Sequence, residues 1–135
     1  MKLSMLLWVA SVLPQHLADQ TCLATTVYLE ARSESTIGQY AVAEVAMRRR
    51  DRSNDGTSVC DVVSAPRQFA ISTTPKTFEV TDLTAWQKAW KIAGDSIDNW
   101  NLPKIAFDCL GRCIEKPKQF CQPQRTLDDA AHAIL

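Results

Sequence analysis

The chain has 135 residues, which is the size of one compact domain. Hydrophobic residues make up 46% of it and only four residues are glycine, so it can form a hydrophobic core and is not a disordered or collagen-like chain. Its fifteen basic and fifteen acidic residues cancel, which argues against a general nucleic-acid binder, because such a protein needs an excess of positive charge. The sequence contains no repeat, low-complexity tract or linker, and one domain is therefore expected.

The N-terminal segment is strongly apolar. Lys2 precedes an apolar stretch over residues 3–13, and Pro14 follows it. This pattern is typical of a secretory signal, and the stretch is shorter than the roughly 20 residues that span a bilayer. We therefore expect residues 1–18 to be a signal peptide or signal anchor, with membrane contact only through this segment, and residues 19–135 to be the folded domain. An ordinary first core helix is the alternative.

The cysteine content also favours an exported protein. Five cysteines in a chain of this length are many for the cytosol, and disulfides persist in the periplasm or outside the cell. The number is odd, so one thiol is left without a partner in the chain. The alternative is a metal site built from Cys109, Cys113 and Cys121, but these spacings fit no common zinc pattern and no C-x-x-C pair occurs. We predict neither a metal nor a cofactor.

Two helices are predicted in the first half of the chain. Thr21 is expected to cap the first, over residues 22–33, where apolar residues recur at helical spacing and Glu30 flanks them. The second covers residues 36–50. A turn is predicted over residues 52–58, because RSNDGTS is rich in turn-forming residues.

The second half is predicted to contain shorter elements and one long helix. Residues 59–66 form a short helix stopped by Pro66, and residues 68–72, QFAIS, form a strand or an extended loop. Asp82 caps a long helix over residues 83–100. The core-facing stripe of that helix is expected to consist of Leu83, Trp86, Trp90 and Ile97.

Residues 101–125 hold three prolines and three cysteines and are predicted to be a loop region stapled by a disulfide. Residues 126–135 are predicted to form a closing helix. The fold class that follows is mainly α, or α+β with minimal sheet.

Glu30 and Glu34 are the first candidate catalytic residues. On a helix, residues four apart lie on one face, and these two glutamates border the apolar side. A solvated helix edge, with Arg32 and the arginines of residues 48–52 as counter-charges, is one interpretation. The other is a catalytic acid, because desolvation disfavours the charged form of a carboxyl group and a protonated carboxyl can donate to a glycosidic oxygen. Glu44, inside AVAEVAM, is a rival acid that we expect on the outward stripe of its helix.

The stretch CLATTVYLEARSESTIGQYAVAEVAMRRR, with TSVCDVV and QFAIS downstream, resembles the cell-wall hydrolase family that includes the spore cortex-lytic enzymes and some phage endolysins. The family pattern combines C-L-A-x-x-V-Y-x-E-A-R-G-E with G-Q-x-A-V-A-x-V, then an N-R pair, P-x-T-V-C-x-V-V and Q-F. The match is dense over residues 22–72. E-A-R-x-E and G-Q-x-A-V-A at this separation form a specific signal.

The resemblance implies a single lysozyme-like, mainly helical domain that cleaves peptidoglycan between N-acetylmuramic acid and N-acetylglucosamine, by lytic transglycosylation or muramidase hydrolysis. It assigns Glu30 as the catalytic acid. It also implies a disulfide between Cys22 and Cys60, which would stabilise the fold by about 3–4 kcal/mol on the chain-entropy model. An exported, monomeric enzyme is expected, in the periplasm or outside the cell. Residues expected to line or support the cleft are Tyr28, Glu34, Gln39, Gln68 and Phe69.

Three positions depart from the family pattern. Ser33 replaces a glycine, and Arg48 replaces the asparagine of the N-R pair. A histidine-containing H-Y-H-like segment has no equivalent, and the nearest segment by position is KIAFDCLG, where Asp108 is a possible second carboxylate. The shortened C-terminal half favours an alternative function, an exported non-catalytic protein that binds peptidoglycan or inhibits a partner on a degenerate lysozyme-like fold.

Overall fold

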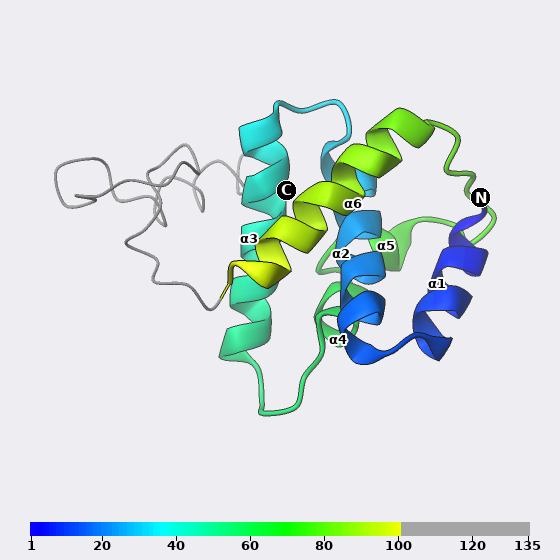
Figure 1. Ribbon diagram of the computed structural model, residues 1–135. Helices are drawn as coiled ribbons and strands as arrows, with labels where there is room; N and C mark the ends of the chain where they lie inside the picture. Colours follow the sequence, from blue (N-terminus) through cyan, green and yellow to red (C-terminus); the bar gives the residue numbers. More distant parts are fainter. Residues whose placement is uncertain (101–135) are drawn as a thin grey trace, which may run out of the picture.

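The computed structural model describes residues 1–100, and this part of the chain is mainly helical, as predicted (Figure 1). Its only β pairing within residues 1–100 is one antiparallel bridge between Lys2 and Glu79. The helices are α1 (Leu3–Val12), α2 (Gln15–Ala31), α3 (Thr36–Arg52), α4 (Val59–Ser64), α5 (Ala70–Thr73) and α6 (Leu83–Asp98).

Helix α2 is the centre of the core. It contacts α1, α3, α4, α5 and α6, which surround it (Figure 1). Because it has neighbours on most sides, nearly all of its second half is buried, including the polar Thr25 and Thr26. Their hydroxyls donate to the carbonyls of Thr21 and Cys22 one turn earlier, so burial leaves no hydroxyl unsatisfied.

The start of α2 differs from the prediction. The helix begins at Gln15, directly after Pro14, and Thr21 lies inside it with its hydroxyl donating to the Leu17 carbonyl. The prediction that Thr21 caps this helix is therefore wrong. Proline fixes φ near the helical value and tolerates the first turn of a helix, so Pro14 marks the start.

The predicted starts of α3 and α6 agree with the structure. Helix α3 begins at Thr36, after Ser35, whose hydroxyl accepts from the Gly38 N–H. Helix α6 begins after Asp82, whose carboxylate accepts from the Ala85 N–H, and the predicted cap is confirmed. Side-chain acceptors at these positions satisfy amides that a helix start leaves without partners.

The core-facing stripe of α6 was only partly predicted. Trp86, Trp90 and Ile97 are half-buried and pack against the core, but Leu83 is 57% exposed, so its assignment was wrong. Leu83 is the first residue of the helix. Because α6 packs closely on α2, its fully buried residues are small or aliphatic. They are Ala89, Ile92, Ala93 and Gly94.

Two shorter elements follow α3. Helix α4 is the predicted short helix before Pro66, and Ser58 and Asp61 form a capping box at its start. The predicted strand or extended loop over residues 68–72 is wrong. Phe69 alone is extended there, and residues 70–73 form the single turn of α5. A short apolar run does not by itself distinguish a strand from a buried helical turn.

Helix α1 packs on α2 as a core helix, with Leu3, Leu6 and Ala10 buried. No helix within residues 1–100 is long and apolar enough to cross a membrane. The predicted loop over residues 101–125 and the closing helix over 126–135 lie outside the described residues, as do Asp108, Cys109, Cys113 and Cys121.

Candidate active site

Glu30 lies in the last turn of α2 and is half-buried. Its Oε1 accepts a hydrogen bond of 2.5 Å from the backbone N–H of Ala70, the first residue of α5. Phe69, the residue directly before α5, has no side-chain hydrogen bond that caps this helix. The carboxyl group of Glu30 therefore satisfies an amide that would otherwise lack a partner, and it joins the end of α2 to the start of α5.

Arg49 of α3 holds the same segment from another element. Its guanidinium lies 4.7 Å from the centroid of the Phe69 ring, and its Nη1 donates to the Gln68 carbonyl at 3.2 Å. An arginine over an aromatic ring is attracted by the negative face of the ring. Residues 68–70 are thus positioned by side chains of both α2 and α3.

Arg67, which precedes this segment, has a left-handed backbone with φ of 61°. This conformation costs a residue with a side chain about 1–2 kcal/mol. A hydrogen bond from its N–H to the Ser72 hydroxyl, at 3.2 Å, helps to hold it. The chain reverses direction here, which turns Phe69 inward and leaves Gln68 exposed next to Ala70.

Gln68 and Phe69, both predicted site residues, therefore lie beside Glu30 in different roles. Phe69 is buried and packs in the core, so it supports the segment and does not line an open surface. The Gln68 side chain is exposed. Of the two, Gln68 is the residue whose side chain is available to a ligand bound at Glu30.

Glu34 was expected to share a helical face with Glu30, and this prediction is wrong. Helix α2 ends at Ala31, and Glu34 lies in the turn before α3 with its side chain exposed. Gln39 is buried, and its Nε2 donates to the Glu34 backbone carbonyl at 3.1 Å. Gln39 is therefore a residue that fixes the α2–α3 turn, which determines where α3 starts relative to Glu30.

Tyr28 is likewise buried in the core. Its ring lies 6.3 Å from the Trp86 ring in an edge-on arrangement, and the Arg32 guanidinium lies 5.1 Å from its centroid. Its hydroxyl accepts from the Asp82 N–H at 3.3 Å. Tyr28 links α2 to the start of α6 and does not face an open surface.

Glu44, the rival acid, is engaged in an ion pair. Its Oε1 accepts from Nε and Nη2 of Arg48 at 3.0 and 2.7 Å, one turn further along α3. The two side chains are 16% and 14% exposed, so the expectation that Glu44 lies on an outward stripe is wrong. Both contacts are charge-assisted hydrogen bonds to one oxygen of Glu44, so this carboxylate is engaged in a structural pair within α3.

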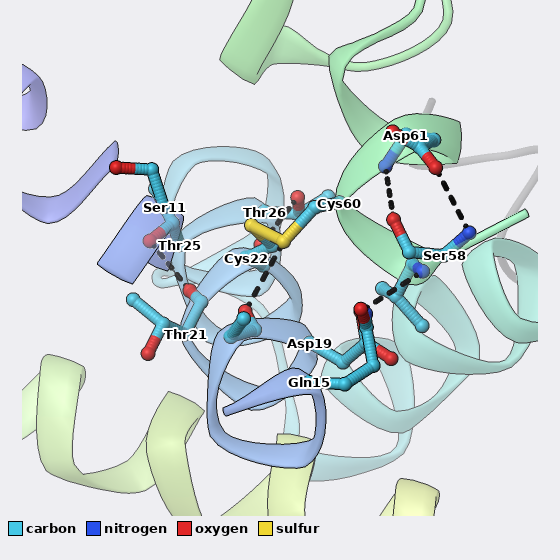
Figure 2. Close-up of a disulfide and its surroundings, with 12 residues drawn as sticks. Ser11, Gln15, Asp19, Thr21, Cys22, Thr25, Thr26, Ser58, Cys60 and Asp61 are labelled. Atoms are coloured by element: carbon cyan, nitrogen blue, oxygen red, sulfur yellow. Dashed lines mark hydrogen bonds between the residues drawn. A yellow bond between two sulfur atoms is a disulfide. The ribbon is translucent and has the colours of Figure 1, made fainter. Parts of the chain in front are cut away.

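The predicted disulfide between Cys22 and Cys60 is present and joins α2 to α4 (Figure 2). The two Cα atoms are 5.2 Å apart, within the range of ordinary disulfides. Nearby, the buried carboxylate of Asp19 accepts from the Val59 N–H at 3.1 Å and from Gln15 Nε2 at 2.8 Å. The bridge and Asp19 together fix the start of α4 against α2.

Helices α3 and α6 are joined by a polar contact. The Tyr40 hydroxyl donates to Asp95 Oδ2 at 3.0 Å. Burial, the hydrogen bond to Asp95 and the negative charge of Asp95 together raise the pKa of Tyr40 to about 12. Each of these effects favours the protonated hydroxyl, so the contact is stable throughout the neutral range.

Two contacts of the segment formed by residues 68–70 were missed by the sequence prediction. The Ala70 N–H was not foreseen because every residue except proline has a backbone amide, and no side chain signals which one will be used. Arg49 belongs to the run RRRDR, and positive charge at a helix C-terminus is already explained by its favourable interaction with the helix dipole. The run therefore gave no signal of a specific contact. The Q-F pair was the one available signal that this segment belongs to the site.

Comparison with known proteins identifies the family. The family model described as cell wall hydrolase matches residues 33–108, more than half of the chain. The matched range includes Glu34, Gln39, Gln68 and Phe69, and it begins three residues after Glu30. No curated protein and no solved structure matches the chain. The chain belongs to the cell wall hydrolase family.

Proposed function

We propose that this protein cleaves the glycan strands of peptidoglycan between N-acetylmuramic acid and N-acetylglucosamine, with Glu30 as the general acid. The family supports action on the cell wall in general. The observation that carries the finer assignment is the state of the Glu30 carboxyl: it is half-buried and bonded through one oxygen, Oε1, to a backbone amide. Within residues 1–100, Oε2 has no hydrogen-bond partner.

This arrangement suits proton donation. A protonated carboxyl group accepts through its carbonyl oxygen and donates through its hydroxyl. With Oε1 accepting from Ala70, the oxygen that would donate a proton to a substrate is Oε2, which has no partner within residues 1–100. When Oε2 donates to the glycosidic oxygen, the bond from that oxygen to C1 of the muramyl residue breaks, and C1 acquires oxocarbenium-like character. The Ala70 N–H then stabilises the carboxylate that is left.

The second half of the reaction distinguishes two chemistries. In lytic transglycosylation, the Glu30 carboxylate removes the proton from the 6-hydroxyl of the same muramyl residue, and O6 closes a 1,6-anhydro ring on C1. In hydrolysis, a second carboxylate across the cleft assists water or stabilises C1. Glu34 is exposed in the α2–α3 turn and Glu44 is paired with Arg48. Because the transglycosylase route needs one carboxylate only, we propose it as the first of the two.

The proposed location is outside the cytoplasm, in the periplasm or beyond it, where peptidoglycan is accessible. The Cys22–Cys60 bridge supports this, because disulfides persist in oxidising compartments. Export directed by residues 1–18 is part of the same proposal, and the packing of residues 3–12 on α2 favours a signal anchor that stays on the chain over a cleaved signal peptide. Action as a monomer is proposed as well.

Digestion of purified sacculi tests the assignment. The wild type should release soluble muropeptides, and Glu30→Gln should release none, although glutamine still offers Oε1 to the Ala70 N–H. Asp55→Asn, which neutralises an exposed carboxylate in the turn between α3 and α4, is the control and should keep most of the activity. If Glu30→Gln digests sacculi as fast as the wild type, Glu30 is not the acid.

A non-catalytic wall-binding protein is the second candidate. It is favoured by the bond between Glu30 and Ala70, since that bond also gives Glu30 a purely structural reason to be present. Under this alternative, wild type and Glu30→Gln bind sacculi equally and neither releases muropeptides.

A further inference from the structure

The beginning of the chain is bound into the fold through its backbone. The Leu3 and Ser4 amides, at the start of α1, donate to the carbonyls of Phe78 and Lys76 at 2.9 and 3.0 Å. The Val80 N–H donates to the Met1 carbonyl, and the Met1 amine donates to the Val80 carbonyl. Figure 1 shows the segment between α5 and α6 passing beside the N-terminus. Helix α1 thus has its free amides satisfied by a distant part of the chain, as a structural helix does.

The outer face of α1 is apolar as well. While Leu3, Leu6 and Ala10 face the core, Met5, Trp8 and Val12 are 47%, 65% and 62% exposed. These three residues recur at helical spacing and lie on one side. Large side chains of this kind gathered on one surface mark a binding site more often than scattered ones do.

This face is hollowed near its start. The hollow is lined by three apolar side chains, Met1, Met5 and Trp8, and by three polar residues, Lys2, Ser4 and Glu79. Ligand sites in proteins commonly combine an apolar or aromatic floor with a few polar groups that fix orientation. Here the polar groups comprise an ammonium, a hydroxyl and a carboxylate.

The hollow is on the same end of α2 as Glu30. Phe78, whose carbonyl accepts from the Leu3 N–H, also contacts the end of α2. The centroid of its ring lies 5.9 Å from the Arg32 guanidinium carbon. Arg32 follows Glu30 by two residues, at the end of α2. A long polymeric ligand bound at Glu30 therefore has this face of the molecule beside it.

We propose that this hollow is an accessory subsite for the peptidoglycan strand, in which the apolar face of an N-acetylhexosamine ring stacks on Trp8. The ring's hydroxyl and amide groups then meet Ser4 and Glu79, and a carboxylate of the muramyl lactyl group or stem peptide lies near the Lys2 ammonium. The identity of the ligand rests on the proposed function. A lipid surface fits less well, because interfacial helices carry Lys and Arg on their polar face. Helix α1 contains no charged residue, and the one carboxylate of the hollow, Glu79, lies 3.9 Å from the Met1 ammonium, so the hollow is not a purely cationic surface for anionic headgroups.

Binding is measured in the Glu30→Gln protein, so that cleavage and binding are read separately. Soluble, uncross-linked glycan strands with their stem peptides are one probe, and a neutral chitooligosaccharide is the second. Trp8→Ala should weaken both by at least about tenfold. Lys2→Gln should weaken only the probe that carries carboxylates. Leu83→Ala removes an exposed apolar side chain of α6, outside the hollow and the apolar face of α1, and should change neither.

A second readout does not depend on variants. The indole N–H resonance of Trp8 in the full chain should shift on titration with the glycan strands, and thermal unfolding of each variant shows that the fold is kept. The proposal is overturned if Trp8→Ala binds both probes as tightly as its parent. It is equally overturned if anionic phospholipid vesicles, and not glycan strands, shift the Trp8 resonance, or if exported protein lacking residues 1–18 binds sacculi with undiminished affinity. Muropeptide release by Glu30→Gln would instead contradict the catalytic assignment alone.

Discussion

The carboxyl group of Glu30 and the backbone N–H of Ala70 join the end of α2 to the first residue of α5 through one hydrogen bond. The structural role of this bond can be separated from the catalytic role that we propose for Glu30, because an acceptor oxygen is enough to hold α5 but only a carboxylic acid can donate a proton. Two substitutions at this position separate them.

Glu30→Gln should keep a stability close to that of the wild type, since the amide oxygen still accepts from Ala70. Glu30→Ala removes the acceptor and should lower the free energy of unfolding by about 2 kcal/mol, because the Ala70 N–H is left without a partner. Urea denaturation of the two variants measures the difference. Equal destabilisation by both would show that the bond to Ala70 contributes little.

Removing the Cys22–Cys60 bridge should destabilise the fold. The bridge closes a loop with a sequence separation of 38 residues, for which the chain-entropy model gives about 4 kcal/mol. The Cys22→Ser, Cys60→Ser double variant should lose about this much in denaturation without reductant. The control is the double variant with reductant added, where little further loss is expected. A double variant as stable as the wild type would contradict the prediction.

Asp19→Ala should also destabilise the protein, by about 2 kcal/mol, because the buried Val59 N–H loses its acceptor at the start of α4. Asp19→Asn retains an acceptor oxygen and should lose less. Thermal unfolding compares the two, and hydrogen exchange at the Val59 amide should be faster in Asp19→Ala. An unchanged exchange rate would mean that Asp19 does not protect this amide.

The raised pKa of Tyr40 predicts that the protein loses stability at alkaline pH. Its pKa is raised from the ordinary 10.0 to about 12 in the folded protein. The folded state therefore holds this proton more tightly than the unfolded state does, so the contribution is complete below pH 10 and is lost as the pH rises from about 10 to about 12. Denaturation at a series of pH values should show this decline in the wild type, and Tyr40→Phe should reduce it. The same decline in both proteins would exclude Tyr40 as its source.

The sequence predicted the features that depend on local pattern or on a specific motif. Helical spacing and capping residues located α3, α4 and α6, and the resemblance to the family supplied the Cys22–Cys60 pairing. The features that were missed depend on tertiary contacts. The backbone amide of Ala70 has no side-chain signature, and the pairing of Glu44 with Arg48 in a largely enclosed site is set by packing around α3.

The N-terminal segment is a second case in which the sequence alone could not distinguish two structures. Composition alone suits both an export signal and a core helix, since each requires an apolar stretch of about this length. Only the contacts of Leu3 and Ser4 with the segment before α6 show that residues 3–12 are part of the helical core. Likewise, the 3.6-residue period predicted that Leu83 faces the core, but this first residue of α6 is exposed, and periodicity alone does not show where the core ends along a helix.

Mass spectrometry of the muropeptides that the wild type and Glu30→Gln release from intact sacculi tests the central assignment most directly. The account predicts fragments ending in 1,6-anhydro-N-acetylmuramic acid from the wild type and none from Glu30→Gln. Fragments with reducing muramic acid ends would show that the protein cleaves the strand by hydrolysis and not by lytic transglycosylation. Undiminished release by Glu30→Gln would contradict the account, because it would show that the carboxyl group bonded to Ala70 is not the acid that breaks the strand.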